Sequence, residues 1–409
     1  MNSRERVVAA LNHREPDRVL VDLDGHRCAA IAAMAYVKLR KYLGLPEKTI
    51  YCYDPIQLLA RVDEDVLERF GVDTVQLGRG FPLPESAWKD WVLPDGTPCK
   101  VPAWAVPERQ NGSWVLRSPE GRVLARLPQG GFFFSQVHFP FAEQADFDNI
   151  PEALADSMWY GIPSPPGPFA EGPEGLKKLA ESAKALRAQT GRAIVGGFGG
   201  SFFEIGQVLF RNDNYMMLLA GERAKAHAFL DRLLEIHLAN LERFLGAVGP
   251  YIDVILFSDD LGMQTGPQLS PAMYREYCKP RHKILWERTK QLADVKIKMH
   301  CDGGVRELLP DLIDAGLEAI NPVQISARGM NARELKAEFG KDLAFWGGGC
   351  DTQEVLPNGT PETVRKHVRE QVGILSRGGG FVFQQVHNIQ ANIAPENIVA
   401  MFDAVDSCA

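Results

Sequence analysis

The feature that most constrains the fold is a regular alternation of strand and helix patterns that begins near residue 176. Short apolar runs, such as 253–257 and 295–300, are separated by longer stretches with the apolar spacing of amphipathic helices, such as 305–315. Six such units follow residue 176, and about two precede it. Eight units over 409 residues favour a (β/α)8 TIM barrel over a doubly wound sheet.

Residues 81–145 have a different pattern. Three turn signals, at 94–96, 111–112 and 119–121, separate short runs of strand-forming residues. This pattern predicts an antiparallel β-hairpin region inserted into the barrel. The whole chain, 1–409, is therefore predicted to form one barrel domain with the insertion inside it.

The part of the chain before the insertion is less regular. Its apolar spacing predicts helices over 3–11, 31–43 and 55–70, and short strands over 19–23 and 71–78. These segments supply the first two strand–helix units of the predicted barrel.

Composition excludes several classes of protein. A net charge of -7 without a block of Lys and Arg gives no reason to expect binding to nucleic acid or to a membrane surface. The seven cysteines are odd in number and lack CxxC spacing, which favours a reducing cytoplasm over a disulfide scaffold. The polar start predicts no signal peptide, and no apolar run reaches the ~18 residues of a membrane-spanning helix. We therefore expect a soluble, cytoplasmic protein.

Polar residues follow nearly every predicted strand. In a barrel, the residues at the carboxyl ends of the strands share one mouth, where such folds carry their chemistry. The residues in these positions are Asp24, His26, Arg27, Arg79, Glu204, Ser258, Asp259, Asp260, Gln264, His300, Asp302, Asn321, Gln324, Cys350, Asp351, His387, Asn388 and Gln390. The His, Cys and carboxylate members are the ligand types that zinc prefers.

The segment 295–304 carries the clearest of these signals. His300 and Asp302 are two residues apart at the end of a strand, so their side chains should point the same way and that of Cys301 the other way. We predict that His300 and Asp302 work as a pair and that Cys301 is packed. Each candidate also has a structural alternative: His300 and His387 can be hydrogen-bonded structural histidines, and Cys350 can be a small packed residue.

Several segments of the chain match a known pattern in order and spacing. They are 4–11 with 16–18, 259–264, 270–271, His300 with 302–303, 321–324, 347–353 with 359–362, and 387–390 with 395–397. With these segments the sequence resembles the uroporphyrinogen decarboxylase superfamily across nearly its whole length. The resemblance implies a (β/α)8 barrel whose site lies at the carboxyl ends of the strands.

The superfamily contains two chemistries. True uroporphyrinogen decarboxylases carry an Arg-rich stretch after the first strand that grips the porphyrinogen carboxylates, whereas residues 23–28 here contain one arginine, Arg27. The other branch contains methyltransferases that move a methyl group to or from a corrinoid (cobalamin) cofactor on a partner protein, some of them with zinc held by His-x-Cys and a later Cys. His300 matches that histidine, Asp302 stands at the second ligand position, and the later Cys falls near His387. The resemblance thus implies zinc held by His300, Asp302 and His387, with Cys350 as a further candidate.

Our hypothesis from the sequence is a corrinoid-dependent methyltransferase that acts on a small methylated donor. Its predicted catalytic residues are His300, Asp302, His387 and Asp260. The residues predicted to bind or orient the substrate are Arg27, Arg79, Glu204, Asp259, Gln264, Asn321 and Gln324. A homodimer would be compatible with a barrel of this size.

Two alternatives stay open. One is a metal-independent decarboxylase or lyase of a small carboxylated substrate, with Arg27 and Arg79 binding carboxylates. The other is a non-catalytic barrel that binds a ligand at its mouth. Metal content separates the first alternative from the methyltransferase, and turnover separates the second.

Overall fold

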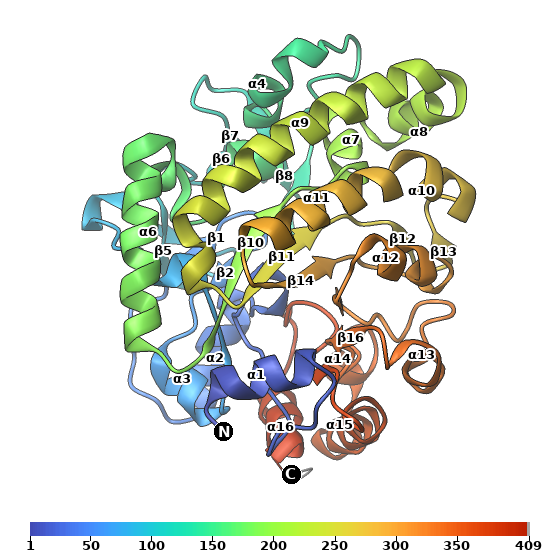
Figure 1. Cartoon of the computed structure of the whole chain (residues 1–409). Coiled ribbons are helices and arrows are strands. Elements are labelled where there is room, and N and C mark those ends of the chain that lie inside the picture. Colours follow the sequence, from blue (N-terminus) through green and yellow to red (C-terminus); the bar gives the residue numbers. More distant parts are fainter. Residues whose placement is uncertain (407–409) are drawn as a thin grey trace.

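The computed structural model describes residues 1–406, and a seven-stranded parallel sheet forms its centre (Figure 1). In spatial order the strands are β17 (Phe381–Val382), β16 (Ala344–Trp346), β15 (Ala319–Asn321), β14 (Lys296–His300), β11 (Val254–Ser258), β10 (Ala193–Gly199) and β3 (Thr74–Gln76). The neighbouring strands of this sheet pair in parallel.

A short extended segment closes the sheet into a barrel. Val21 forms a parallel bridge with Phe383, just after β17, and the amide of Asp22 donates to the Phe383 carbonyl at 2.8 Å. On its other side, the amide of Asp73, just before β3, donates to the carbonyl of Val21 at 2.8 Å. Residues 20–22 therefore occupy the eighth strand position, and the predicted (β/α)8 barrel is confirmed.

Helices cover the outside of the barrel. Along the chain they are α1 (Ser3–Leu11), α2 (Ala33–Tyr42), α3 (Glu64–Arg69), α4 (Ile150–Ala155), α5 (Met158–Gly161), α6 (Gly172–Gln189), α7 (Phe203–Phe210), α8 (Asn212–Gly221), α9 (Arg223–Val248), α10 (Pro271–Tyr277), α11 (Lys279–Leu292), α12 (Leu309–Ala315), α13 (Ala332–Phe339), α14 (Val355–Asn358), α15 (Pro361–Leu375) and α16 (Pro395–Asp406). Apolar residues on one side of a helix determine which face packs against the rest of the protein. In α15, for example, Val364, Val368 and Val372 are buried on one face, and the Thr360 side chain caps the first turn by accepting from the amide of Thr363.

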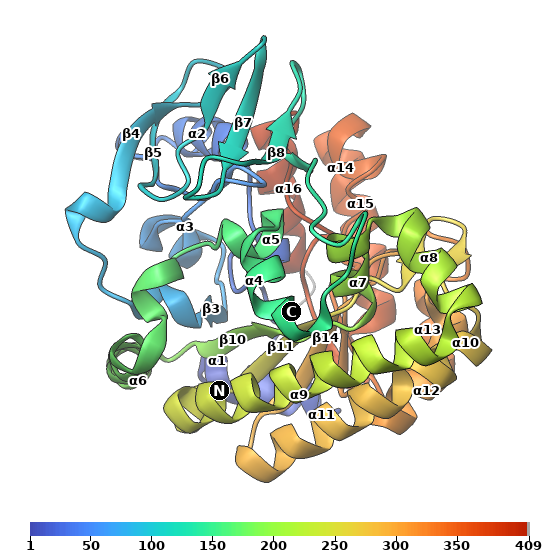
Figure 2. The same cartoon turned by 90° about the horizontal axis from the view of Figure 1, so that it is seen from above.

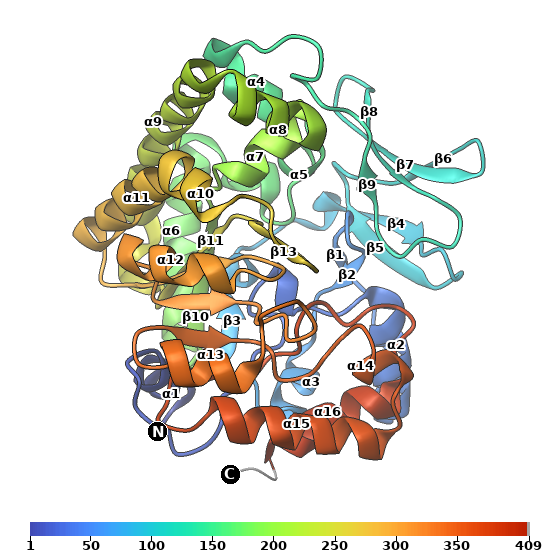
Figure 3. The ribbon, with the colours of Figure 1, turned by 90° about the vertical axis from the view of Figure 1, so that its right-hand side faces the viewer.

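The insertion forms antiparallel sheets, as predicted. Strands β4 (Trp88–Val92) and β5 (Pro98–Pro102) pair with each other, and β6 (Glu108–Gln110), β7 (Ser113–Arg117), β8 (Val123–Leu127) and β9 (Ser135–Gln136) form a four-stranded sheet. Gly96, Gly112 and Gly121 have positive φ at the three predicted turns, a conformation that glycine adopts without strain. These strands lie on the side of the molecule opposite α11 (Figures 2 and 3).

Two predicted elements differ in the structure. The helix predicted over 55–70 is confined to α3, because residues before it form an antiparallel hairpin of β1 (Cys52–Asp54) and β2 (Leu59–Ala60). The hairpin turn places Leu58 at φ 54°, which a helix does not allow. The region 270–292 is divided into α10 and α11 at Cys278. Within residues 1–406, the structure contains no helix that is both long enough and apolar enough to cross a membrane.

Candidate active site

Five side chains from four places in the barrel converge at the carboxyl ends of its strands. His300 is the last residue of β14, and Asp302 follows it. Cys28 lies in the 3₁₀ turn η1 (Arg27–Ala29), just after the closing segment 20–22. His387 follows β17, and Asp260 follows β11. The chain therefore brings together the predicted residues His300, Asp302, His387 and Asp260, as expected of barrel strand ends.

The side-chain N, O and S atoms of this cluster lie close to one another, as the atoms that bind one metal ion do. The Cys28 Sγ lies 3.4 Å from the His300 Nε2. The Asp302 Oδ2 lies 3.6 Å from the same nitrogen and 3.7 Å from the His387 Nε2. The ligand atoms of Cys28, His300 and His387 all lie within 4.8 Å of one another, and so do those of Asp260, His300 and Asp302.

Asn321 fixes the ring of His300. The Asn321 Nδ2 donates to the carbonyl of Trp346 at 2.8 Å and to the Gln384 Oε1 at 3.0 Å, so its Oδ1 is the atom that faces the His300 Nδ1 at 3.0 Å. An amide oxygen only accepts, and therefore the Nδ1 of His300 carries the proton. The Nε2 of His300 faces Cys28 and Asp302 and is the atom that would bind a metal ion after losing its proton.

The charges of the cluster stabilise one another. Burial raises the pKa of the Cys28 thiol, but His300 beside it, with hydrogen bonds from His26 and His387, holds that pKa well below its usual range. Burial also raises the pKa of Asp302, but His300 and His387 lower it to about 2. Burial lowers the pKa of His300, but Cys28 and Asp302 raise it well above its usual range. Cys28 and Asp302 are thus held in the deprotonated forms that bind metals.

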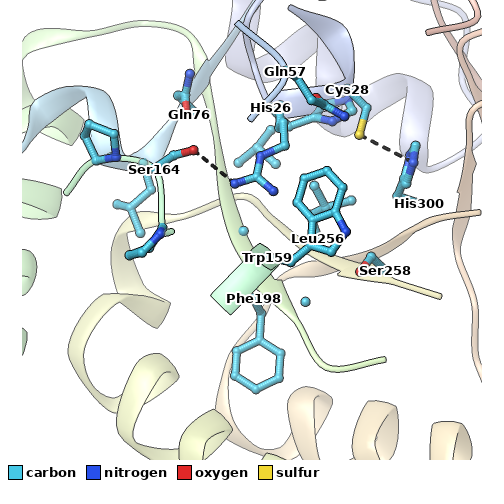
Figure 4. A pocket seen from close by; sticks show the side chains of 18 of the residues that line it. His26, Cys28, Gln57, Gln76, Trp159, Ser164, Phe198, Leu256, Ser258 and His300 are labelled. Atoms are coloured by element: carbon cyan, nitrogen blue, oxygen red, sulfur yellow. Dashed lines mark hydrogen bonds between the residues drawn. The ribbon is translucent and has the colours of Figure 1, made fainter. Parts of the chain in front are cut away.

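The cluster forms one end of a cavity of about 680 Å³. Trp159, Phe198 and Leu256 belong to its apolar wall, and Figure 4 shows Trp159 and Leu256 between His300 on one side and Ser164 on the other. Of the residues that the sequence places at the barrel mouth, those that line the cavity are His26, Arg27, Glu204, Ser258, Asp260, His300, Asp302 and His387. A cavity of this size accepts a small organic ligand.

Glu204 and Asp260 form an acidic part of the wall. Glu204 lies in the first turn of α7, and its Oε2 accepts a hydrogen bond from the Ser258 hydroxyl at 3.2 Å. Burial, together with the charges of Asp260 and Asp259, raises the pKa of Glu204 to about 8. Burial raises the pKa of Asp260 to about 6, against the opposing charge of His300. At neutral pH Glu204 therefore carries a proton that it can donate.

The two arginines predicted to bind carboxylates already have carboxylate partners. The Nε of Arg27 lies 2.6 Å from the buried Asp54 Oδ2, and its Nη2 donates to the Ser164 hydroxyl at 3.0 Å (Figure 4). The Nη1 of Arg79 lies 3.0 Å from the buried Asp24 Oδ2, and Arg79 is outside the cavity lining. Each positive charge is thus compensated within the protein, which weakens the hypothesis of a decarboxylase.

Other predicted substrate residues support the site from outside the cavity. Asp259 is fully buried and accepts from the amides of Phe202, Phe203 and Glu204. Gln324 donates to the Gln264 Oε1 at 2.8 Å and accepts from the amide of Gly303, so this pair joins the loops after β11, β14 and β15. Asp259, Gln264, Asn321 and Gln324 do not line the cavity and have structural partners instead.

The cysteine of the cluster is not the predicted one. Cys350 is fully buried, and its thiol faces the carbonyl of Asp351 at 3.7 Å. Among the described residues, it belongs to neither of the two groups whose potential metal-binding atoms lie within 4.8 Å of one another. Cys28 is the cysteine that lies in the cluster. In the sequence, Cys28 could have been recognised as a candidate from its position two residues after His26 and directly after the first strand, in the stretch that carries Arg27.

Comparisons with known proteins agree with this architecture. The family described as "Uroporphyrinogen decarboxylase (URO-D)" matches residues 135–408, which is most of the chain. A methylated-thiol–coenzyme M methyltransferase from Methanosarcina mazei is 29% identical over 146 residues, an alignment that spans 36% of this chain and 36% of that relative. The chain therefore matches about a third of the length of this relative. The solved structure of a methyltransferase from Methanosarcina mazei, 17% identical, covers 100% of this chain and 99% of its own with a TM-score of 0.60, and so shares the fold.

Proposed function

The chain belongs to the uroporphyrinogen decarboxylase family, and from this membership we propose that it is a zinc-assisted methyltransferase. It moves a methyl group between a small methylated donor and a corrinoid carried by a partner protein. The observation that carries the proposal is the convergence of Cys28, His300 and His387, whose donor atoms lie within 4.8 Å of one another at one end of a ligand-sized cavity. The name of the partly matching relative, a methyltransferase, supports the same chemistry.

The donor set fits zinc. Zinc binds Cys, His and carboxylate ligands tetrahedrally at ~2.0–2.3 Å, so neighbouring ligand atoms should lie roughly 3.3–3.6 Å apart. The separations of 3.4, 3.6 and 3.7 Å are close to that range, whereas Asp302 and Cys28 belong to different groups of ligand atoms and would have to approach each other to share one ion. We propose that Cys28, His300 and His387 hold the ion and that Asp302 is a fourth ligand, beside which the leaving atom of the donor would bind as a fifth. Cys28 takes the place that the sequence suggested for Cys350.

A bound zinc would supply a Lewis acid at the atom that leaves the methyl group. The residues of the chain supply the remaining help. Asn321 holds the imidazole of His300 in one orientation, and the cavity wall holds the donor with its methyl group towards the mouth. Glu204, protonated at neutral pH, lies in the same wall and donates a proton to the leaving atom.

The methyl carbon forms its new bond with the electron pair of the cobalt(I) corrinoid, which is the second substrate. The pair of the broken bond stays on the oxygen, sulfur or nitrogen of the donor, and this atom takes the proton from Glu204. Protonation matters because an alkoxide or amide anion is a poor leaving group.

Methylation of cob(I)alamin tests the proposal. Zinc-loaded wild-type protein should form methylcobalamin from cob(I)alamin and at least one donor among methanol, dimethyl sulfide and 2-methoxyphenol. His300→Ala and His387→Ala should reduce the rate to that of the mixture without protein. The control is His227→Ala on α9, whose ring faces Glu276 outside the cavity, and it should keep the wild-type rate. Wild-type rates in both cluster variants would exclude these roles.

A further inference from the structure

The cavity has an apolar arm that a very small methyl donor would not need. We define this arm as the part of the cavity that Val195, Gly197 and Leu256 of β10 and β11 line, and Phe244 of α9 and Leu179 of α6 also line the cavity. Trp159 covers this arm (Figure 4). The whole cavity of about 680 Å³ offers space for an aromatic ring beyond the methyl group.

Gly197 opens this space. A Cβ added at Gly197 would meet no atom within 4 Å, although the residue lines the cavity and pairs with Leu256 in the sheet. By contrast, a Cβ at the neighbouring Gly196 would meet the Ile252 side chain at 2.9 Å. The missing side chain of Gly197 is therefore cavity volume, and it lies beside the apolar floor.

The charge of the wall opposes an anionic ligand. Among the described residues, Arg27 is the one Lys or Arg that lines the cavity, and Asp54 already compensates its charge. The carboxylates of Asp260 and Asp302 line the same cavity. A carboxylate on the ligand would face these acids without an uncompensated cation to bind it.

We propose that the methyl donor is a neutral aryl methyl ether or thioether, whose ring lies in the apolar arm and whose methyl group points to the cluster. This inference rests on the proposed function, because it names the substrate class of the same site. The flat ring fits between Trp159 and the floor of Leu256 and Gly197, where stacking adds to the burial of apolar surface.

Calorimetric binding tests the substrate class without methyl transfer. The probes are 2-methoxyphenol, 2-methoxybenzoate at a pH at which it is ionised, and methanol, each titrated into zinc-loaded protein. The neutral 2-methoxyphenol should bind at least ~10-fold more tightly than the other two, since one misplaced group in a fitted pocket costs roughly 10-fold or more.

Variants that fill the apolar arm with a side chain test the same proposal. Gly197→Leu should weaken binding of 2-methoxyphenol by ~10-fold or more, and Gly197→Ala should weaken it less, with unchanged zinc content in both. The control is Gly246→Leu on the exposed face of α9, where an added Cβ also meets no atom within 4 Å. This control should bind as the wild type does.

The outcomes separate the two proposals. Equal binding of 2-methoxybenzoate, unchanged affinity in Gly197→Leu, or competition of cobalamin itself for the arm would overturn the substrate class. If methanol or dimethyl sulfide methylates cob(I)alamin while 2-methoxyphenol does not bind, the methyltransferase stands and the aryl donor is rejected. If 2-methoxyphenol binds as described but no donor is demethylated, the neutral aryl ligand stands and the methyltransferase is rejected.

Discussion

Glu204 is a carboxyl group whose surroundings keep it protonated. Burial and the nearby Asp260 and Asp259 raise its pKa from 4.5 to about 8 in the folded protein. Below pH 4.5 the residue is protonated in both folded and unfolded chains. As the pH rises from 4.5 to 8, the unfolded chain loses this proton first, so the folded protein loses stability over that window.

The variant Glu204→Gln should remove this loss, because an amide does not ionise. The free energy of unfolding of the variant, relative to wild type, should rise between pH 5 and pH 8 by on the order of a few kcal/mol. Urea denaturation of zinc-free protein at pH 5, 6.5 and 8 measures it. A difference that stays constant with pH would contradict the protonated state assigned to Glu204.

At the scale of residues, the sequence predicted part of the cluster for a physical reason. His300, Asp302, His387 and Asp260 follow strands, and parallel strands end at one rim. Cys28 could not be predicted in the same way, because its place depends on how the turn η1 folds back over the rim. Cys350 also follows a strand, but it forms a bridge with Gln385, and its thiol faces the carbonyl of Asp351.

At the scale of elements, Asp259 joins β11 to the start of α7. It is fully buried, accepts three backbone amides at the first turn of α7 and lies 3.2 Å from the His282 Nε2. Its role is to hold the helix that carries Glu204, whereas the sequence suggested that it binds substrate. An unsatisfied helix start inside the protein is costly.

Asp259→Ala should therefore lower the free energy of unfolding by about 3–5 kcal/mol, since it leaves several buried donors unpaired. The control is Asp213→Ala, which removes an exposed pair with Arg211 and should cost less than about 1 kcal/mol. Equilibrium urea denaturation compares the two. Similar small costs in both variants would show that Asp259 does not hold α7.

Helices and strands whose apolar residues repeat at a regular spacing were predicted well, whereas elements whose structure depends on distant contacts were not. The spacing of α15 is visible in the sequence because the helix buries one side, whereas β14 is buried on both sides, Lys298 included. Residues 55–60 carry apolar residues that also suit a helix, yet they form a hairpin that packs on the closing part of the barrel: the amide of Ala60 donates to Ile31, and that of Ala33 donates to Leu58. Such distant partners leave no local signal.

At the scale of the whole molecule, the insertion and the barrel share one hydrophobic core. Leu116, Leu124 and Phe134 of the insertion belong to the same continuous buried cluster as Ile297 and Phe345 of the barrel. The sequence predicted the barrel from its repeated units, but not its closure by residues 20–22, which depends on hydrogen bonds to segments more than 50 and 350 residues away.

A shared core predicts one cooperative unfolding transition. Four of the seven tryptophans (Trp88, Trp91, Trp104 and Trp114) lie in the insertion, so fluorescence reports mainly on it, whereas the circular dichroism of the helices reports on the barrel. The two urea transitions should coincide. An earlier fluorescence transition would instead show that the insertion unfolds as a domain of its own.

The measurement that tests the central claim most directly is zinc analysis, with X-ray absorption at the zinc edge, of protein purified without a His-tag or chelator. We expect about one zinc per chain, with one sulfur ligand from Cys28 and at least three nitrogen or oxygen ligands. Cys28→Ala should lose the sulfur and most of the zinc, whereas Cys350→Ala should keep both. Unchanged zinc and sulfur in Cys28→Ala, or their loss in Cys350→Ala, would contradict the site described here.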